Sequence, residues 1–157
     1  MNASDLEALR AMVGREVTYR APDALSDASG RYFARAVGDD NPLYRRAEGP
    51  IVPPTLIFET TQIADSPPNA DGYAGHSWPI EFPGTRLLRG GHRYTWHRDV
   101  RPDDVITSTW RLDAVVERST SAGNPMVVVT STCRYSDERG DVIAENEETL
   151  LFVAATS

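Results

Sequence analysis

The sequence GDDNPLY brings a carboxylate, an amide and a phenol close together, and these groups could carry out acid/base chemistry. Asp39 and Asn41 follow Gly38, a residue type that often ends a helix, and Pro42 favours a turn. A carboxylate at such a helix end is exposed to a ligand but held by local hydrogen bonds, so Asp39 is a candidate acid/base residue. Tyr44 can donate a hydrogen bond or act as an acid, but tyrosine is a poor base at neutral pH.

The three histidines are further candidates for a base. We favour His92, because it directly follows the pair Gly90 and Gly91, which allows a ligand to approach the backbone closely. The alternative interpretation of the two glycines is a β-bulge. His76 lies in a predicted loop and could close over a ligand, whereas His97 would face the opposite side of the strand from His92.

Arginines and a predicted helix start could bind an anionic group. Arg89 and Arg93 are expected on one face of a strand, and arginine is well suited to bind phosphate. Pro54 and Thr55 are expected in the first turn of a helix, where the helix dipole favours negative charge. The acidic residues Glu145, Glu147 and Glu148 are expected on a solvated face.

Composition restricts the class of protein that carries these residues. The chain has 157 residues, which fits a single domain over residues 1–157, and its formal net charge of −7 argues against a broad nucleic-acid surface. One cysteine cannot form an internal disulfide, and no Cys/His cluster has zinc spacing, so we expect no metal. No apolar run is long enough for a membrane span and no signal peptide is recognisable, so we expect a cytoplasmic protein.

The periodicity predicts three helices, a short strand and a long loop before the sheet. The predicted segments are an N-terminal helix within 1–14, a strand at 16–20, a helix at 28–37 capped by Ser26, a helix at 55–64, and a flap loop at 65–85. We expect Tyr32, Phe33, Ala36 and Val37 to face the core.

Four strand-like runs follow at regular spacing, over residues 87–100, 105–118, 126–135 and 142–153. The turns between them contain Pro, Gly, Asn and Asp, which is typical of an antiparallel meander. A strand, then helices, then four strands predict an α+β domain.

Four segments together resemble the MaoC-like hydratases and dehydratases, in particular the N-terminal, fatty-acid-synthase-type-I-like dehydratase domain family. These segments are ARAVGDDNPLY, VPPT, LLRGGHRY and HRDVRPDD, and the resemblance extends over residues 14–152. It implies a hot-dog fold, in which a curved antiparallel sheet wraps a central helix, here the helix predicted at 55–64. The family motif is Gly-Asp-x-Asn-Pro-x-His, and Tyr44 occupies the position of its histidine.

The resemblance implies an enoyl-thioester hydratase or 3-hydroxyacyl-thioester dehydratase with Asp39 as its acid/base residue. Tyr44 and His92 are the other expected catalytic residues, and the Gly91 N–H is a candidate donor to the thioester oxygen. The expected substrate-binding residues are Asn41, Pro54, Thr55, Gly90, Gly91, Arg89, Arg93 and His76. No separate cofactor is expected, because coenzyme A or phosphopantetheine enters only as part of the substrate.

The resemblance also implies assembly, because the family places its acyl tunnel at a subunit interface. We expect a homodimer, or a heteromer with a second MaoC-like chain, that receives an acyl thioester or an acyl carrier protein. Two other functions stay open. The chain could add an amine such as glycine to C3 of an enoyl thioester and hydrolyse the thioester, as a thioesterase-like enzyme, or it could be a non-catalytic acyl-binding subunit of a heteromeric hydratase.

Overall fold

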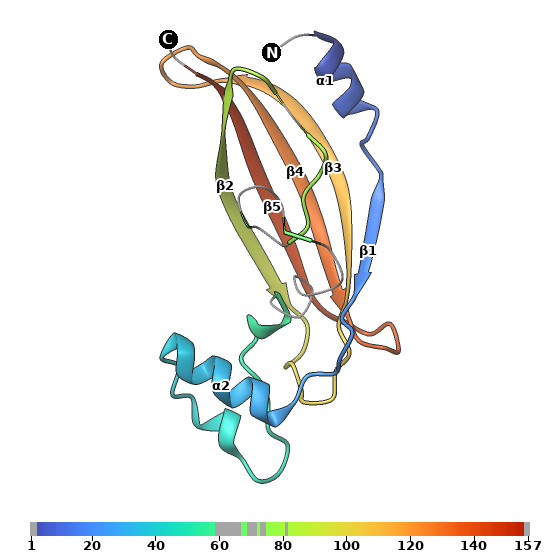
Figure 1. Ribbon diagram of the computed structural model, residues 1–157, viewed down its shortest axis with the longest axis vertical. Helices are drawn as coiled ribbons and strands as arrows, with labels where there is room; N and C mark the ends of the chain where they lie inside the picture. Colours follow the sequence, from blue (N-terminus) through green and yellow to red (C-terminus); the bar gives the residue numbers. More distant parts are fainter. Residues whose placement is uncertain (1–2, 59–66, 69–71, 73–74, 81, 156–157) are drawn as a thin grey trace.

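The computed structural model describes residues 3–58, 67–68, 72, 75–80 and 82–155. Five strands in these residues form one antiparallel sheet that curves along its length (Figure 1). They are β1 (Glu16–Arg20), β2 (Thr85–Trp96), β3 (Thr107–Ser119), β4 (Pro125–Ser136) and β5 (Val142–Ala154). The predicted α+β class, the early short strand and the four later strands are therefore confirmed.

The order of the strands across the sheet is β1-β3-β4-β5-β2. The expected meander is correct for the β3–β4 and β4–β5 hairpins but wrong for β2, which pairs with β5. The connection from β2 to β3 must pass the ends of β4 and β5, and β3 then pairs with β1. As a result β1 and β2 are the two edges of the sheet, and β2 carries the segment LLRGGHRY along one of them.

One face of the sheet, which we call the inner face, is covered by the chain. It carries the even-numbered residues of β5 and the residues that pair with them. The described part of segment 75–84 crosses this face (Figure 1). There the indole of Trp78 donates a hydrogen bond of 2.8 Å to Ser131 Oγ, and Phe82 packs edge-on against Phe152. The predicted loop at 65–85 thus contributes to the core in its described second half.

Two α-helices lie within the described residues. Helix α1 (Ala3–Arg10) is shorter than the predicted segment 1–14, because a turn that ends at Gly14 follows it. Helix α2 (Asp27–Val37) begins at Ser26, whose side chain accepts a hydrogen bond from the Ser29 N–H, as the predicted cap requires. No helix within the described ranges has the length and apolarity needed to cross a membrane.

The core face of α2 differs from the prediction. Tyr32 is 76% exposed and Val37 57% exposed, whereas Gly30 and Ala34 are buried. A Cβ on Gly30 would lie 2.6 Å from Val52 Cγ1, so the helix can approach its neighbour only through a face of small residues. The expected core contacts of Tyr32, Val37 and the exposed Ala36 are therefore wrong, whereas Phe33 packs against the core as predicted.

The helix expected at 55–64 is described only at its start. Leu56–Phe58 form a helical turn, in which the Leu56 N–H donates to the Pro53 carbonyl at 3.0 Å. Ile57 is fully buried, and the Phe58 ring stacks on Tyr94 of β2 at a centroid distance of 4.8 Å. Residues 59–64 lie outside the described residues, and with them most of the predicted central helix.

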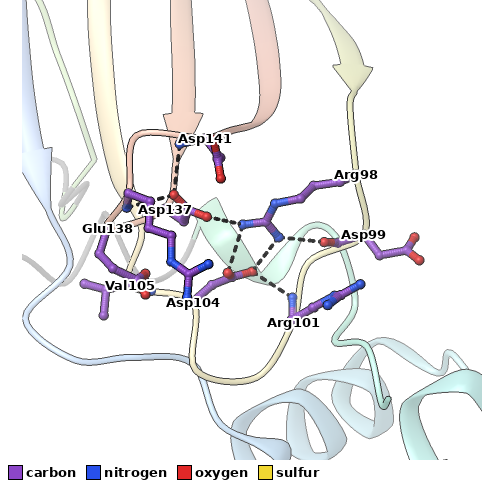
Figure 2. A network of polar contacts seen from close by, with 9 residues as sticks. Arg98, Asp99, Arg101, Asp104, Val105, Asp137, Glu138 and Asp141 are labelled. Atoms are coloured by element: carbon purple, nitrogen blue, oxygen red, sulfur yellow. Dashed lines mark hydrogen bonds and ion pairs between the residues drawn. The ribbon is translucent and has the colours of Figure 1, made fainter.

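An ion-pair network fixes the connection that follows β2 (Figure 2). Arg98 donates two hydrogen bonds of 2.9 Å to Asp104 and one of 3.0 Å to Asp137, so it joins this connection to the β4–β5 turn. Both carboxylates are nearly buried, with side-chain exposures of 11% and 10%. The hydrogen bonds to Asp104 raise the pKa of Arg98. Asp104 lies in the turn predicted between the runs at 87–100 and 105–118, and its ion pair with Arg98 holds its carboxylate nearly buried there.

Candidate functional site

The end of α2 brings together the residues of the GDDNPLY segment. Gly38 adopts a left-handed conformation (φ 73°), which ends the helix. Asn41 caps the short 3₁₀ helix η1 (Pro42–Arg45) by accepting a hydrogen bond from the Leu43 N–H. The carboxylate of Asp39 accepts the Asn41 N–H at 3.1 Å and the Tyr44 hydroxyl at 2.8 Å. Asp39 itself is half-buried.

Tyr44 is a hydrogen-bond donor at the position where the family motif has histidine. Tyr44 is 6% exposed, and burial, together with the hydrogen bond to Asp39, raises the pKa of its hydroxyl. At neutral pH the hydroxyl therefore stays protonated, and it donates a hydrogen bond to Asp39. The expectation that tyrosine here is no base fits this geometry.

A cleft with a volume of about 480 Å³ lies next to this segment. Its lining includes Pro54 at the start of the third helix, Trp96 at the end of β2, and Arg98 and Arg101 on the following connection. The cleft borders the GDDNPLY segment through Ile51, whose N–H points to the Leu43 carbonyl. Asp39 is not among the residues that line this cleft, and Thr55 is exposed.

The pair Gly90 and Gly91 forms a β-bulge in β2. The register with β5 shifts between Arg89 and Gly91, and a Cβ on Gly90 would lie 3.1 Å from the Thr149 backbone oxygen. Gly91 has φ 152°, a conformation that other residues rarely adopt. The bulge interpretation is therefore correct, while an interaction of the Gly91 N–H with a ligand stays a prediction.

The bulge changes which arginine shares a face with His92. Arg89 pairs with Leu150 and His92 with Glu148, so both lie on the inner face, although they are three residues apart. Arg93 pairs with Glu147 and lies on the opposite face. The expectation that Arg89 and Arg93 share a face is therefore wrong, because the extra residue of the bulge reverses the alternation.

Four polar side chains meet on the inner face, and we call them the inner-face cluster: Arg89, His92, Asn146 and Glu148. Arg89 donates to Glu148 Oε1 at 2.7 Å, and His92 Nε2 lies 3.8 Å from the same oxygen. His92 Nδ1 lies within hydrogen-bond distance of the Asn146 amide, 3.3 Å from Oδ1 and 3.2 Å from Nδ2. Glu148 is 6% exposed and Asn146 1% exposed.

Sequence reasoning missed two members of this cluster. Glu148 was expected on a solvated face, which is wrong, and Asn146 was not considered. The available signal was alternation, because Asn146 and Glu148 share their parity with the buried Ala144 and Phe152 on β5. A run of three glutamates in four residues hid that pattern.

Comparison with known proteins decides the family. The family described as FAS1-like, dehydratase domain region, matches residues 11–146. The chain belongs to this family. A UPF0336 protein of Streptomyces coelicolor is 29% identical over 140 residues, which cover 84% of this chain and 86% of that protein.

Solved structures show the fold of this dehydratase-region domain. The ChsH1–ChsH2 complex of Mycobacterium tuberculosis contains a chain with a TM-score of 0.71 at 18% identity, covering 98% of this chain and 92% of that one. The HadBC (3R-hydroxyacyl-ACP dehydratase) complex of the same organism gives a TM-score of 0.58 at 17% identity, covering 88% and 96%. The predicted MaoC-like hot-dog fold is therefore confirmed for this domain.

His76 of the dehydratase-region domain packs in the core beside Trp78, which does not fit a lid that closes over a ligand. Its ring stacks on Trp110 at a centroid distance of 4.8 Å, and its Nδ1 lies 2.9 Å from the Tyr19 hydroxyl. Burial lowers the pKa of His76 to about 4. Its buried Nε2 has no hydrogen-bond partner in the described part of the chain. Substrate contact by His76 stays a prediction.

The burial of His76 predicts a pH dependence of folding stability. Because its pKa is about 4 in the folded state and has its ordinary value of 6.5 in the unfolded chain, the unfolded chain binds more protons between these values. The free energy of unfolding is therefore unaffected by His76 above pH 6.5. As the pH falls from 6.5 toward 4, His76 lowers the free energy of unfolding by up to roughly 3 kcal/mol. Urea unfolding of the wild type and of His76→Gln from pH 7 to pH 4 should show the steeper loss in the wild type. Parallel pH profiles would contradict this assignment.

Metal binding has no support in the described part of this domain, where no group of three His, Cys, Asp or Glu side chains could hold an ion. Cys133 is buried, and burial raises the pKa of its thiol to about 12. A thiol with such a pKa is a poor nucleophile at neutral pH.

Proposed function

We propose that the protein acts on acyl thioesters as an enoyl-thioester hydratase or 3-hydroxyacyl-thioester dehydratase, with Asp39 as its acid/base residue. Family membership supports the reaction class, and the observation that carries the assignment is the Asp39 carboxylate held at the end of α2 by the Asn41 N–H and the Tyr44 hydroxyl. A carboxylate fixed from two sides keeps one orientation toward a bound substrate.

One carboxylate is sufficient for a balanced reaction. In hydration, Asp39 accepts a proton from water while the water oxygen bonds to C3, and the C2–C3 π electrons move to C2 and the thioester oxygen. Asp39 then returns the proton to C2, so that one water is added and the carboxylate is regenerated. Dehydration is the reverse. Tyr44 serves as a positioning residue in both directions, because its hydroxyl donates to Asp39.

The second candidate function is an acyl-binding subunit that works with a catalytic partner chain. The replacement of the motif histidine by Tyr44 favours it, and the two structural relatives described above are named as complexes of two chains. Edge strand β2 supports assembly, because its exposed apolar side chains include Leu87 and Leu88. We infer that β2 faces a second copy of the chain or a second hot-dog chain.

Two measurements on the purified protein test this proposal. Loss of the enoyl absorbance of crotonyl-CoA reports hydration, and calorimetric titration with crotonyl phosphopantetheine thioester reports binding. Turnover by the protein alone supports the hydratase. Binding without turnover supports the acyl-binding subunit, and loss of absorbance only after glycine is added indicates amine addition. Absence of both turnover and binding overturns the proposed function.

A further inference from the structure

The inner-face cluster holds an ion pair that packing alone does not require. Burying a carboxylate is costly unless it is paired, and a well-packed apolar residue is often as stable in such a place. Glu148 has a side-chain exposure of 7%, while Arg89 and His92 above it have exposures of 52% and 33%. The buried carboxylate therefore holds two partly exposed nitrogen groups at the accessible edge of the sheet.

The β-bulge at Gly90 and Gly91 brings Arg89 and His92 onto the same face of the sheet. Without the bulge, Arg89 and His92 would point to opposite faces, because they are three residues apart. The close approach of Gly90 to Thr149 and the φ of 152° at Gly91 allow the register shift that brings both to Glu148. The two adjacent glycines thus serve to gather these polar groups.

The hydrogen bonds indicate which nitrogen of His92 faces a ligand. A carboxylate oxygen 3.8 Å from Nε2 favours the tautomer with its proton on Nε2, and Nδ1 then accepts from the Asn146 amide at 3.2 Å. At 3.8 Å the Nε2–H makes no hydrogen bond to Glu148. The cluster can therefore offer an N–H donor beside a carboxylate acceptor.

A row of rings joins the cluster to the 480 Å³ cleft. Trp96 lines the cleft, Tyr94 stacks near it at 6.3 Å, and His92 lies 5.8 Å beyond Tyr94. Phe58 stacks on Tyr94 at 4.8 Å, but Tyr94 and Trp96 stay 36% and 38% exposed, so a ligand can contact the uncovered part of each ring. At about 3.3 Å per strand residue, the path from Trp96 to His92 is about 13 Å long.

We propose that the inner-face cluster binds a hydroxyl group on the distal part of the acyl chain, so that the protein prefers hydroxylated acyl thioesters to plain alkyl ones. A hydroxyl both accepts from the His92 N–H and donates to Glu148. A ketone leaves Glu148 without a donor, a carboxylate meets the like charge of Glu148, and a methyl group desolvates the cluster without hydrogen bonds. This inference rests on the proposed function, because it assumes that the ligand is an acyl thioester.

Binding of matched ligands tests the proposal. The probes are acyl thioesters of phosphopantetheine, the arm that coenzyme A and carrier proteins share, from six to twelve carbons, each ending in methyl, hydroxyl or carboxylate. At the best length the hydroxyl form should bind about tenfold more tightly than the methyl form. His92→Phe, Arg89→Met and Glu148→Gln should each reduce this ratio to near one.

Arg86→Met is the matched control, because Arg86 pairs with Val153 and lies on the opposite face of the same strand. It should keep the wild-type ratio. A role limited to holding β2 on β5 would lower the melting temperature of the cluster variants without changing the ratio.

Binding of plain acyl thioesters without a hydroxyl preference at any length, or a preference that survives in the cluster variants, overturns this proposal and leaves the proposed function standing. Absence of binding by every thioester overturns both.

Discussion

Replacing Arg98 with methionine is expected to lower the free energy of unfolding by about 3–5 kcal/mol, the usual cost of removing one partner of a buried ion pair. The loss leaves Asp104 and Asp137 nearly buried without their cation, and it releases the connection that lines the cleft. Urea denaturation at pH 7 measures the effect, with a constant denaturant slope as evidence of two-state unfolding.

Arg10→Met is the control for this substitution. Its ion pair with Glu117 has side-chain exposures of 47% and 57%, so its loss should cost at most about 1 kcal/mol. Equal effects of the two substitutions would show that the Arg98 network contributes no more than a surface pair.

At acidic pH the wild type and the Arg98 variant should differ less in their free energy of unfolding. Burial alone would raise the pKa of Asp137, but hydrogen bonds from the Asp141 and Arg139 N–H groups and from Arg98 hold it below its ordinary value of 3.8. A depressed carboxyl pKa contributes stability that is present above 3.8 and is lost as the pH falls through the folded-state value. The advantage of the wild type should therefore shrink below about pH 4.

Replacing Asp39 with asparagine is expected to lower kcat for enoyl-thioester hydration by about 10²–10⁴-fold, the range for losing a general acid/base residue. Asparagine keeps a carbonyl oxygen that can accept the Tyr44 hydroxyl, so the turn should remain folded and thioester binding should change little. Initial rates with crotonyl-CoA measure the loss, in whichever assembly is active.

The neighbouring Asp40→Asn separates this effect from a general loss of negative charge. The Asp40 side chain is 95% exposed and lies 3.8 Å from Arg45, so its substitution should leave kcat within about twofold. A wild-type rate in D39N would remove Asp39 from the mechanism.

Local signals predicted the parts of the fold that local hydrogen bonds determine. Ser26 and Gly38 bound α2 because a side-chain cap and a left-handed residue act within one turn of helix. The buried face of α2 was predicted wrongly, because Val52, which follows in a distant segment, selects the small residues Gly30 and Ala34. Large apolar side chains on a helix therefore do not by themselves identify its core face.

In the candidate site, too, contacts within one segment were predictable, whereas contacts between distant strands were not. Asp39, Asn41 and Tyr44 lie within six residues, so their contacts could be predicted from the segment itself. The inner-face cluster could not, since Glu148 meets Arg89 only after a register shift between strands that are far apart in sequence. One residue of bulge decides which side chains share a face.

The most direct test of the role of Asp39 is a crystal structure of the protein, in its active assembly, with a bound enoyl thioester. We predict that C3 of the enoyl group lies beside the Asp39 carboxylate, with one water between them at hydrogen-bond distance, about 2.6–3.2 Å from the carboxylate. An enoyl group bound elsewhere, with the carboxylate of Asp39 facing bulk solvent, would contradict this prediction.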